Sequence, residues 1–94
     1  MTHKAALEKA LTDVRVERAR QDAKWGADRS QPDAIWLAIL TEEVGESAEE
    51  VLALDWADGD PKAQRMIRTN RLRAELIQVA AVAVAWVEAI DDDR

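Results

Sequence analysis

Five glutamates fall within the nine positions 42–50 of this chain. They are Glu42, Glu43, Glu46, Glu49 and Glu50. No lysine or arginine lies between Arg29 and Lys62, so no basic residue of this stretch offsets them. Like charges three or four residues apart on a helix repel by about 0.2–0.5 kcal/mol per pair. Clustered carboxylates are the usual ligands of hard cations, and Mg²⁺ commonly joins them to a phosphate, so the segment indicates a metal site. A solvated acidic face is the alternative.

A second pair of oxygen-bearing side chains lies near the most apolar part of the chain. Glu75 and Gln78 are three residues apart, so both lie on one side of a helix. Glu43 and Glu46 have the same spacing. If the two helices pack side by side, all four side chains can converge on one Mg²⁺. For Gln78 the alternative is a core amide that is hydrogen-bonded to a neighbouring glutamate. A di-iron site is disfavoured, because the only histidine, His3, is far from a Glu-x-x-His spacing.

No pattern for a protein nucleophile is present. Ser30 and Ser47 have no histidine partner, and the phosphate-binding pattern GxxxxGK[ST] is missing from the sequence. Any hydrolysis therefore requires a metal-activated water molecule.

Tryptophan is the only aromatic residue, and it occurs four times. Trp86 is expected in the core. Trp36 lies seven residues before Glu43, so it either flanks the site or packs in the core. Trp25 and Trp56 are expected in loops, where each either packs over the end of the domain or stacks on a nucleotide base.

The basic residues are concentrated after the acidic stretch, at Lys62, Arg65, Arg68, Arg71 and Arg73. Arginine forks suit phosphate oxygens, although most of this block is expected to neutralise the acidic helix. We expect Arg71 of the block, and Lys24 beside Trp25, to bind the phosphates of a substrate.

Good helix formers dominate the sequence, and alternating strand patterns are missing from it. The fold is therefore expected to be all-α. Thr2 is expected to cap the first helix, Gly59 to reverse the chain, and Asp60 and Pro61 to start the third helix. The predicted helices are three long ones, 3–24, 32–54 and 71–90, and a short basic one, 62–69.

The last helix carries the strongest structural signal. From Leu76 to Val87 only Gln78 is polar, and a helix that is apolar nearly all round must be surrounded by other helices. One small chain does not supply enough of them. We therefore expect a four-helix-type core that is completed by a second copy with twofold symmetry.

Length and charge limit the alternatives. Ninety-four residues make one domain, 1–94. The net charge of −6 argues against binding of nucleic-acid polymers. The longest apolar run is too short to cross a membrane, and the N-terminal residues lack the apolar core of a signal peptide. There is no cysteine, which suits a reducing compartment, and we expect a cytoplasmic protein.

Several segments together resemble a known family. They are EEVGE at 42–46, AELIQ at 74–78, QDAKWG at 21–26 and WLAILTEEVGE at 36–46. With them the chain resembles the all-α nucleoside triphosphate pyrophosphatase superfamily, and within it the small MazG-like proteins. The superfamily pattern is EExxE followed by ExxD, and the resemblance extends from about Arg18 to Trp86.

The resemblance implies a Mg²⁺-dependent hydrolase that converts nucleoside triphosphates, often noncanonical or deoxy forms, to a monophosphate and pyrophosphate. Mn²⁺ is a possible substitute, and a homodimer or homotetramer is implied. By position, Glu43, Glu46 and Glu75 would be metal ligands and Glu42 would activate water or bind a second ion. Trp25 lies near the position that stacks on the base in some relatives, and Trp56 lies near a second aromatic position.

Gln78 departs from the pattern, because the family has an aspartate there. An amide coordinates through its oxygen but contributes no charge. Two alternatives therefore stand beside the enzyme. One is a protein that binds nucleotide without efficient turnover, and the other is a helical assembly module without a ligand.

Overall fold

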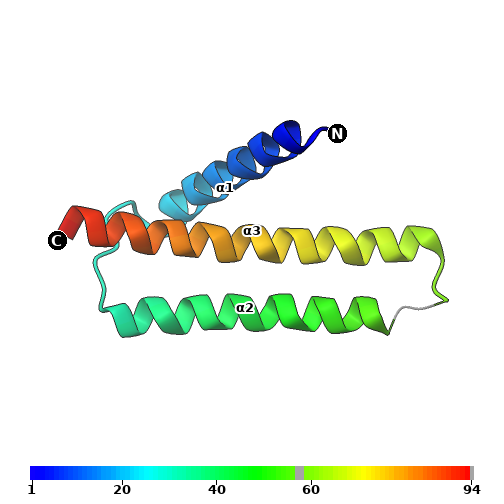
Figure 1. Cartoon of the computed structure of the whole chain (residues 1–94). Coiled ribbons are helices and arrows are strands. Elements are labelled where there is room, and N and C mark those ends of the chain that lie inside the picture. Colours follow the sequence, from blue (N-terminus) through cyan, green and yellow to red (C-terminus); the bar gives the residue numbers. More distant parts are fainter. Residues whose placement is uncertain (57–58, 94) are drawn as a thin grey trace.

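The protein is an antiparallel pair of long helices with a third helix packed on one of them. The computed structural model describes residues 1–56 and 59–93. Its helices are α1 (His3–Trp25), α2 (Asp33–Asp55) and α3 (Lys62–Asp93), and the described residues contain no strand. α3 is the central helix, because it packs against both α2 and α1. Figure 1 shows that α1 approaches the C-terminal half of α3 and diverges from it toward the N-terminus. The all-α prediction is confirmed.

Local signals set most helix ends. The Thr2 hydroxyl accepts a hydrogen bond from the Ala5 backbone N–H at 3.1 Å, so the predicted cap is confirmed. Gly26 ends α1 with φ of 89°, a conformation that side chains disfavour. Pro32 precedes α2 as its capping residue instead of starting it. Gly59 reverses the chain with φ of 91°, as predicted, while positions 57 and 58 of the same turn lie outside the described residues.

The predicted short helix and last helix are a single helix. α3 runs without a break through Thr69 and Asn70, where the sequence was expected to separate two elements. Both residues cost only a few tenths of a kcal/mol in a helix, and neither glycine nor proline occurs within α3. Pro61 precedes α3, and its carbonyl accepts hydrogen bonds from the backbone of Gln64 and Arg65. None of the described helices has an apolar stretch of bilayer length.

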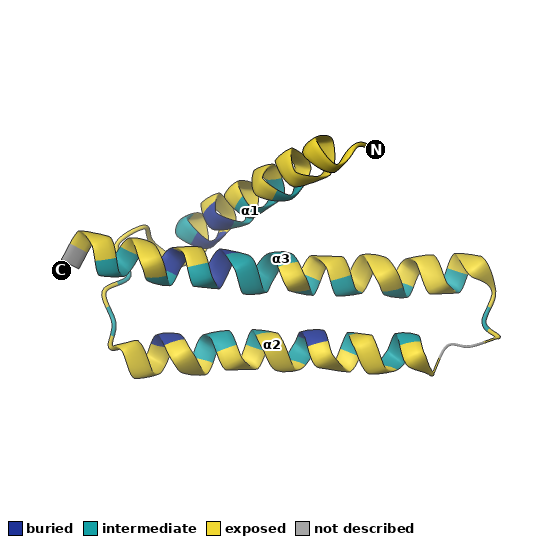
Figure 2. Ribbon diagram, in the orientation of Figure 1, coloured by how far each residue is buried: buried dark blue, intermediate teal, exposed yellow. Residues whose placement is uncertain are grey.

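The core is small and lies at one end of the hairpin. Trp36, Val82 and Ala85 form its buried centre, and Trp36 is only 2% exposed. The flanking side chains are partly buried: Ile39, Leu40, Trp86 and Ala89. Figure 2 shows that most of the surface of all three helices is exposed. The prediction that Trp86 is a core residue is confirmed in part. Its ring packs against the core but is only partly buried, and its indole N–H donates a hydrogen bond to Asp33 at 3.0 Å.

We predict that Trp36→Ala destabilises the folded chain by about 3–5 kcal/mol, the usual cost of removing a buried large aromatic side chain. Trp56→Ala is the matched control, because Trp56 is 81% exposed and its removal should change stability by less than about 0.5 kcal/mol. Urea unfolding followed by circular dichroism measures both. Equal losses in the two variants would contradict the placement of the core.

Candidate metal and nucleotide site

The register of the hairpin brings the two acidic segments together. Trp36 of α2 and Val82 of α3 belong to one core cluster. Glu43 lies two turns after Trp36 on α2, and Glu75 lies two turns before Val82 on α3. Since the helices are antiparallel, the register that packs Trp36 also places Glu43 opposite Glu75. Glu46 follows one turn later.

The carboxylates of Glu43, Glu46 and Glu75 form one half-buried cluster. One oxygen from each lies within 4.8 Å of the others. Burial raises the pKa of Glu43, and the charges of Glu46 and Glu42 raise it further. Burial also raises the pKa of Glu75, followed by its hydrogen bond to Glu46 and the charge of Glu46. The folded chain therefore holds like charges close together in partial shelter from water.

The surroundings of this cluster suit a cation. Among the described residues, no lysine or arginine forms an ion pair with any of its three glutamates. The Oε2 atom of Glu75 is buried and has no hydrogen-bond partner. Three carboxylates with a spare oxygen match the donor set that Mg²⁺ and Mn²⁺ take in proteins. The acidic cluster that the sequence predicted is present, and the identity of an ion remains a prediction.

Gln78 is held by α1. Its amide nitrogen donates to Glu17 Oε1 at 2.7 Å, and its oxygen accepts from the Gln21 amide at 3.4 Å. The contact to Gln21 leaves one lone pair on the Gln78 oxygen, so the predicted ligand role stays a prediction. The charge of Glu17 also contributes to the raised pKa of Glu43. α1 thus adds a fourth carboxylate near the cluster, which sequence reasoning missed.

A cleft of about 580 Å³ extends from the cluster to Trp25, and we call it the Trp25 cleft. Polar and aromatic side chains line it: Gln21, Trp25, Asp28, Arg29, Gln31, Trp36, Glu42, Glu43 and Gln78. The Gln31 amide nitrogen and the Trp36 indole nitrogen are buried donors without a hydrogen-bond partner. Both suit a ligand that presents acceptor atoms.

Cations lie over the rings at the outer end of the Trp25 cleft. Lys24 Nζ is 4.6 Å from the Trp25 ring centroid, and the Arg29 guanidinium is 5.5 Å from it and 5.3 Å from that of Trp36. Burial, and then the charge of Arg18, lowers the pKa of Arg29. An anionic ligand, or one with hydrogen-bond acceptors, would stabilise the charged guanidinium of Arg29. Sequence reasoning missed Arg29, whose only signal was its place four residues after Trp25.

The remaining predicted site residues lie in different places. Glu42 is exposed and lines the Trp25 cleft. Trp36 is a core residue with one side on the cleft, so both of its proposed roles are compatible with its position. Arg71 is exposed one turn before Glu75 on α3. Trp56 ends α2, at the opposite end of that helix from Trp36.

The basic block is partly engaged elsewhere. Arg73 forms an ion pair with Asp13 of α1 at 2.6 Å, and Arg68 forms one with Asp60 at 3.6 Å. These two arginines therefore pair with aspartates that lie outside the glutamate cluster. Neither of these two ion pairs involves a glutamate of the cluster.

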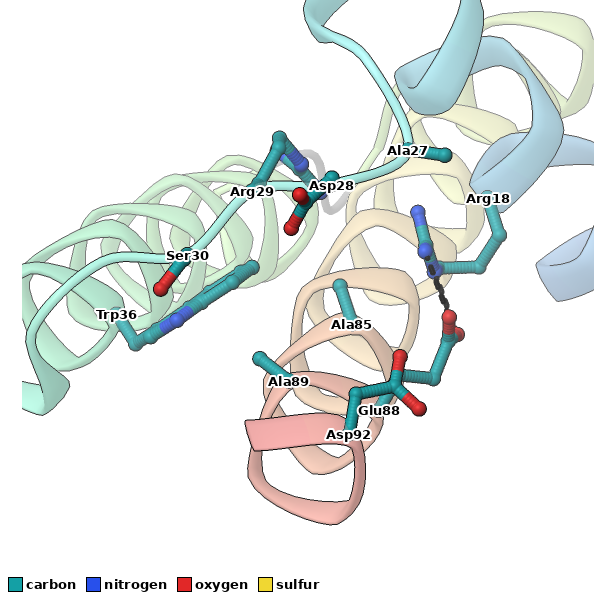
Figure 3. A pocket seen from close by; sticks show the side chains of 10 residues that line it. All are labelled: Arg18, Ala27, Asp28, Arg29, Ser30, Trp36, Ala85, Glu88, Ala89 and Asp92. Atoms are coloured by element: carbon teal, nitrogen blue, oxygen red, sulfur yellow. Dashed lines mark hydrogen bonds and ion pairs between the residues drawn. The ribbon is translucent and has the colours of Figure 1, made fainter. Parts of the chain in front are cut away.

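Figure 3 shows a second hollow, of about 290 Å³, between the 26–32 loop and the C-terminal ends of α1 and α3. Arg18 is buried there and donates two hydrogen bonds of 3.0 Å to the Glu88 carboxylate, and a third to Asp22. This contact fixes α1 against α3 and positions the loop that carries Arg29. Arg18 and Glu88 are 70 residues apart, so no spacing in the sequence indicated their pairing.

Comparison of the chain with models of protein families, with curated proteins and with solved structures finds no match in any of the three.

We predict that Glu43→Gln stabilises the metal-free chain, and increasingly so as pH rises above about 4.5, the ordinary value for this group. A raised pKa means that the folded chain binds the proton more tightly than the unfolded chain, so its stability is greatest below that pH and falls as pH rises through the folded pKa. Glutamine has no ionisable carboxyl group, so the variant does not undergo this loss of stability. Urea unfolding of both proteins between pH 4 and 7, with chelator present, measures the difference. A difference that is constant with pH would contradict the repulsion.

Proposed function

We propose that the protein is a Mg²⁺-dependent nucleoside triphosphate pyrophosphohydrolase that releases pyrophosphate and a nucleoside monophosphate. One observation carries the proposal. Glu43 lines one end of the Trp25 cleft and belongs to a cluster of three glutamates that has no basic partner among the described residues, and the other end of the cleft holds an aromatic ring and two cations. A nucleotide has the matching order of parts, with phosphates at one end and a base at the other. We propose a cytoplasmic site of action, where such substrates are free in solution.

We assign different roles to the residues at the two ends of the Trp25 cleft. A bound Mg²⁺ would join Glu43, Glu46 and Glu75 to phosphate oxygens and lower the pKa of a water molecule. At the rim of the cleft, Glu42 would accept the proton of the attacking water. The water oxygen would form a bond to the α-phosphorus while the bond from that phosphorus to the bridging oxygen breaks, and pyrophosphate would leave with the electron pair of the broken bond.

Side chains at the outer end would hold the nucleoside. Trp25 offers its ring to the base, and stacking of this kind contributes about 1–3 kcal/mol. Arg29, Gln31 and Trp36 line the cleft, and their N–H groups would donate hydrogen bonds to acceptor atoms of the ligand. Lys24, which lies over the Trp25 ring, and Arg71, which is one turn before Glu75, would neutralise phosphate charge.

Gln78 supports the alternative of nucleotide binding without efficient turnover. Its amide is bound to Glu17 and Gln21, and it supplies no charge to the cluster. Metal affinity is then lower than with a fourth carboxylate, while the Trp25 end of the cleft is unaffected. If a nucleotide binds but no pyrophosphate is released, this alternative is supported.

We also propose that the core is completed by self-association, as a homodimer or a homotetramer. The radius of gyration is 15.5 Å, whereas a compact chain of 94 residues has about 12 Å. The single chain is therefore too extended to cover its own apolar surface.

We predict that the protein releases pyrophosphate from nucleoside triphosphates when Mg²⁺ or Mn²⁺ is present, and that Glu46→Gln lowers the rate at least about 100-fold. Loss of a metal ligand removes several kcal/mol of transition-state stabilisation. Glu49→Gln is the matched control, because Glu49 is exposed on the same helix and outside the cluster. A panel of ribo- and deoxyribonucleotides, assayed for pyrophosphate, tests this. Glu46→Gln should also abolish the thermal stabilisation by Mg²⁺, and a shift that survives would place the ion elsewhere.

We predict that Trp25→Ala weakens nucleotide binding by about 5- to 150-fold, the equivalent of 1–3 kcal/mol of stacking. The fold should persist, because Trp25 is 52% exposed at the end of α1. Titration of nucleotide monitored by tryptophan fluorescence, with Trp56→Ala as control, measures the affinity. Equal affinities for wild type and Trp25→Ala would contradict stacking and indicate that Trp25 only packs against the end of the domain.

A further inference from the structure

Three side chains that line the Trp25 cleft carry N–H groups that no described residue accepts. They are the indole of Trp36, the amide of Gln31 and the guanidinium of Arg29. The side-chain nitrogens of Trp36 and Gln31 are buried without a partner, and Arg29 forms no hydrogen bond or ion pair with a described residue. Buried donors in folded proteins are paired as a rule, so these three indicate a position where a ligand supplies acceptor atoms.

The start of α2 contributes to the lack of partners. Gln31 precedes Pro32, the capping residue of α2, and Trp36 lies one turn after it. The Pro32 carbonyl already accepts from the backbone N–H groups of Ile35 and Trp36, at 3.0 and 3.3 Å. A carbonyl oxygen has two lone pairs, so this one has none left for the Gln31 amide or the Trp36 indole.

The acceptors of the Trp25 cleft are either engaged or hydrated. The Gln21 oxygen accepts from Arg18 at 3.5 Å, and the Gln78 oxygen accepts from Gln21 at 3.4 Å. Asp28 and Glu42 also line the cleft, but both are exposed, so water solvates their carboxylates. An unpaired buried donor costs more free energy than an exposed carboxylate. The buried donors therefore decide which ligand the cleft prefers.

Arg29 is the donor that a stacked base would meet. Its guanidinium is 5.5 Å from the Trp25 ring centroid and 5.3 Å from that of Trp36. A base that stacks on Trp25 therefore has its edge within reach of this fork. Two N–H groups of a guanidinium match two acceptors that lie side by side, and the fork accepts nothing in return. Because the side chain is long and flexible, its movement toward a ligand would also open a path to the Trp36 indole.

We infer that the Trp25 cleft selects nucleotides whose base carries a keto oxygen over those that carry an amino group at the same position, and that Arg29 reads this oxygen. Uracil has oxygen at position 4 where cytosine has an amino group, and guanine has oxygen at position 6 where adenine has one. An amino group would turn hydrogens toward the donors of Arg29, Gln31 and Trp36 and leave them unpaired. The inference rests on the proposed nucleotide site but requires no hydrolysis.

Two other roles of these residues make different predictions. If Arg29 bound phosphate oxygens, its removal would weaken all nucleotides alike. If the carboxylate of Asp28 read the base, amino bases would bind more tightly than keto bases. The relative affinities of matched bases therefore separate these roles from the inferred one.

Isothermal calorimetry with Mg²⁺ at pH 7 measures these affinities without turnover. The ligands are uridine, cytidine, guanosine and adenosine triphosphates in which a methylene group replaces the oxygen between the α- and β-phosphates. We expect the keto member of each pair to bind at least about 10-fold more tightly than the amino member. Equal affinities within both pairs, or tighter binding of the amino members, would overturn the inference alone. Binding of none of the four would refute the proposed nucleotide site and the inference with it.

Three variants assign the preference to its residues. Arg29→Met keeps an unbranched side chain without donors, and it should reduce the uridine-to-cytidine affinity ratio at least about 5-fold. Gln31→Glu replaces a buried donor by an acceptor of the same shape, so it should shift the ratio toward cytidine. Lys24→Met is the matched control, because Lys24 lies 4.6 Å from the Trp25 ring centroid but does not line the cleft. It should weaken both nucleotides equally and leave the ratio unchanged. A ratio that neither Arg29→Met nor Gln31→Glu changes would overturn the inference.

Discussion

The packing of Trp36 against Val82 and Ala85 is the contact on which the candidate site depends. It fixes the register of two antiparallel helices at one end of the hairpin. Two turns further along, the same register requires the glutamates of α2 to meet Glu75 of α3. The core contact therefore supplies the free energy that holds like charges together, because the repulsion within the cluster acts against the same packing. A site of this kind is poised for a cation that removes the repulsion.

On α2, some charged and polar side chains lie along the contact with α3, while several large apolar side chains are exposed. Glu43, Ser47 and Glu50 lie on or near the contact line of α2, while Leu37 and Val51 face solvent. Few of the described apolar residues are buried, and a chain of this length has a marginal core in any case. A metal ion at the carboxylates would offset the repulsion among them.

α1 contributes by positioning a loop rather than by filling the core. Its buried residues are polar, Arg18 and Gln21, and they bind Glu88 and Gln78 of α3. These bonds direct the end of α1 so that Trp25 and Arg29 border the cleft. Gln78, which stands where the MazG-like pattern has an aspartate, is the link between this helix and the acidic cluster. Its exchange for an acid would change the contact with Glu17 as well as the charge of the site.

The sequence by itself determined the helical class, the cap at Thr2, the reversal at Gly59 and the placement of Glu43 and Glu46 on one face of a helix, because spacing and local backbone chemistry specify all of these. That Glu75 joins the two glutamates depended on the register in which α2 and α3 pack. The sequence did not determine that the third and fourth predicted helices are one, since Thr69 and Asn70 are only slightly unfavourable in a helix and do not interrupt α3. Only the tertiary structure decided that Arg18 pairs with Glu88, that Gln78 turns to α1 and that Arg29 lies between two tryptophans. Those contacts join residues far apart in the chain, and their partners are fixed by the register of helices that local sequence does not encode.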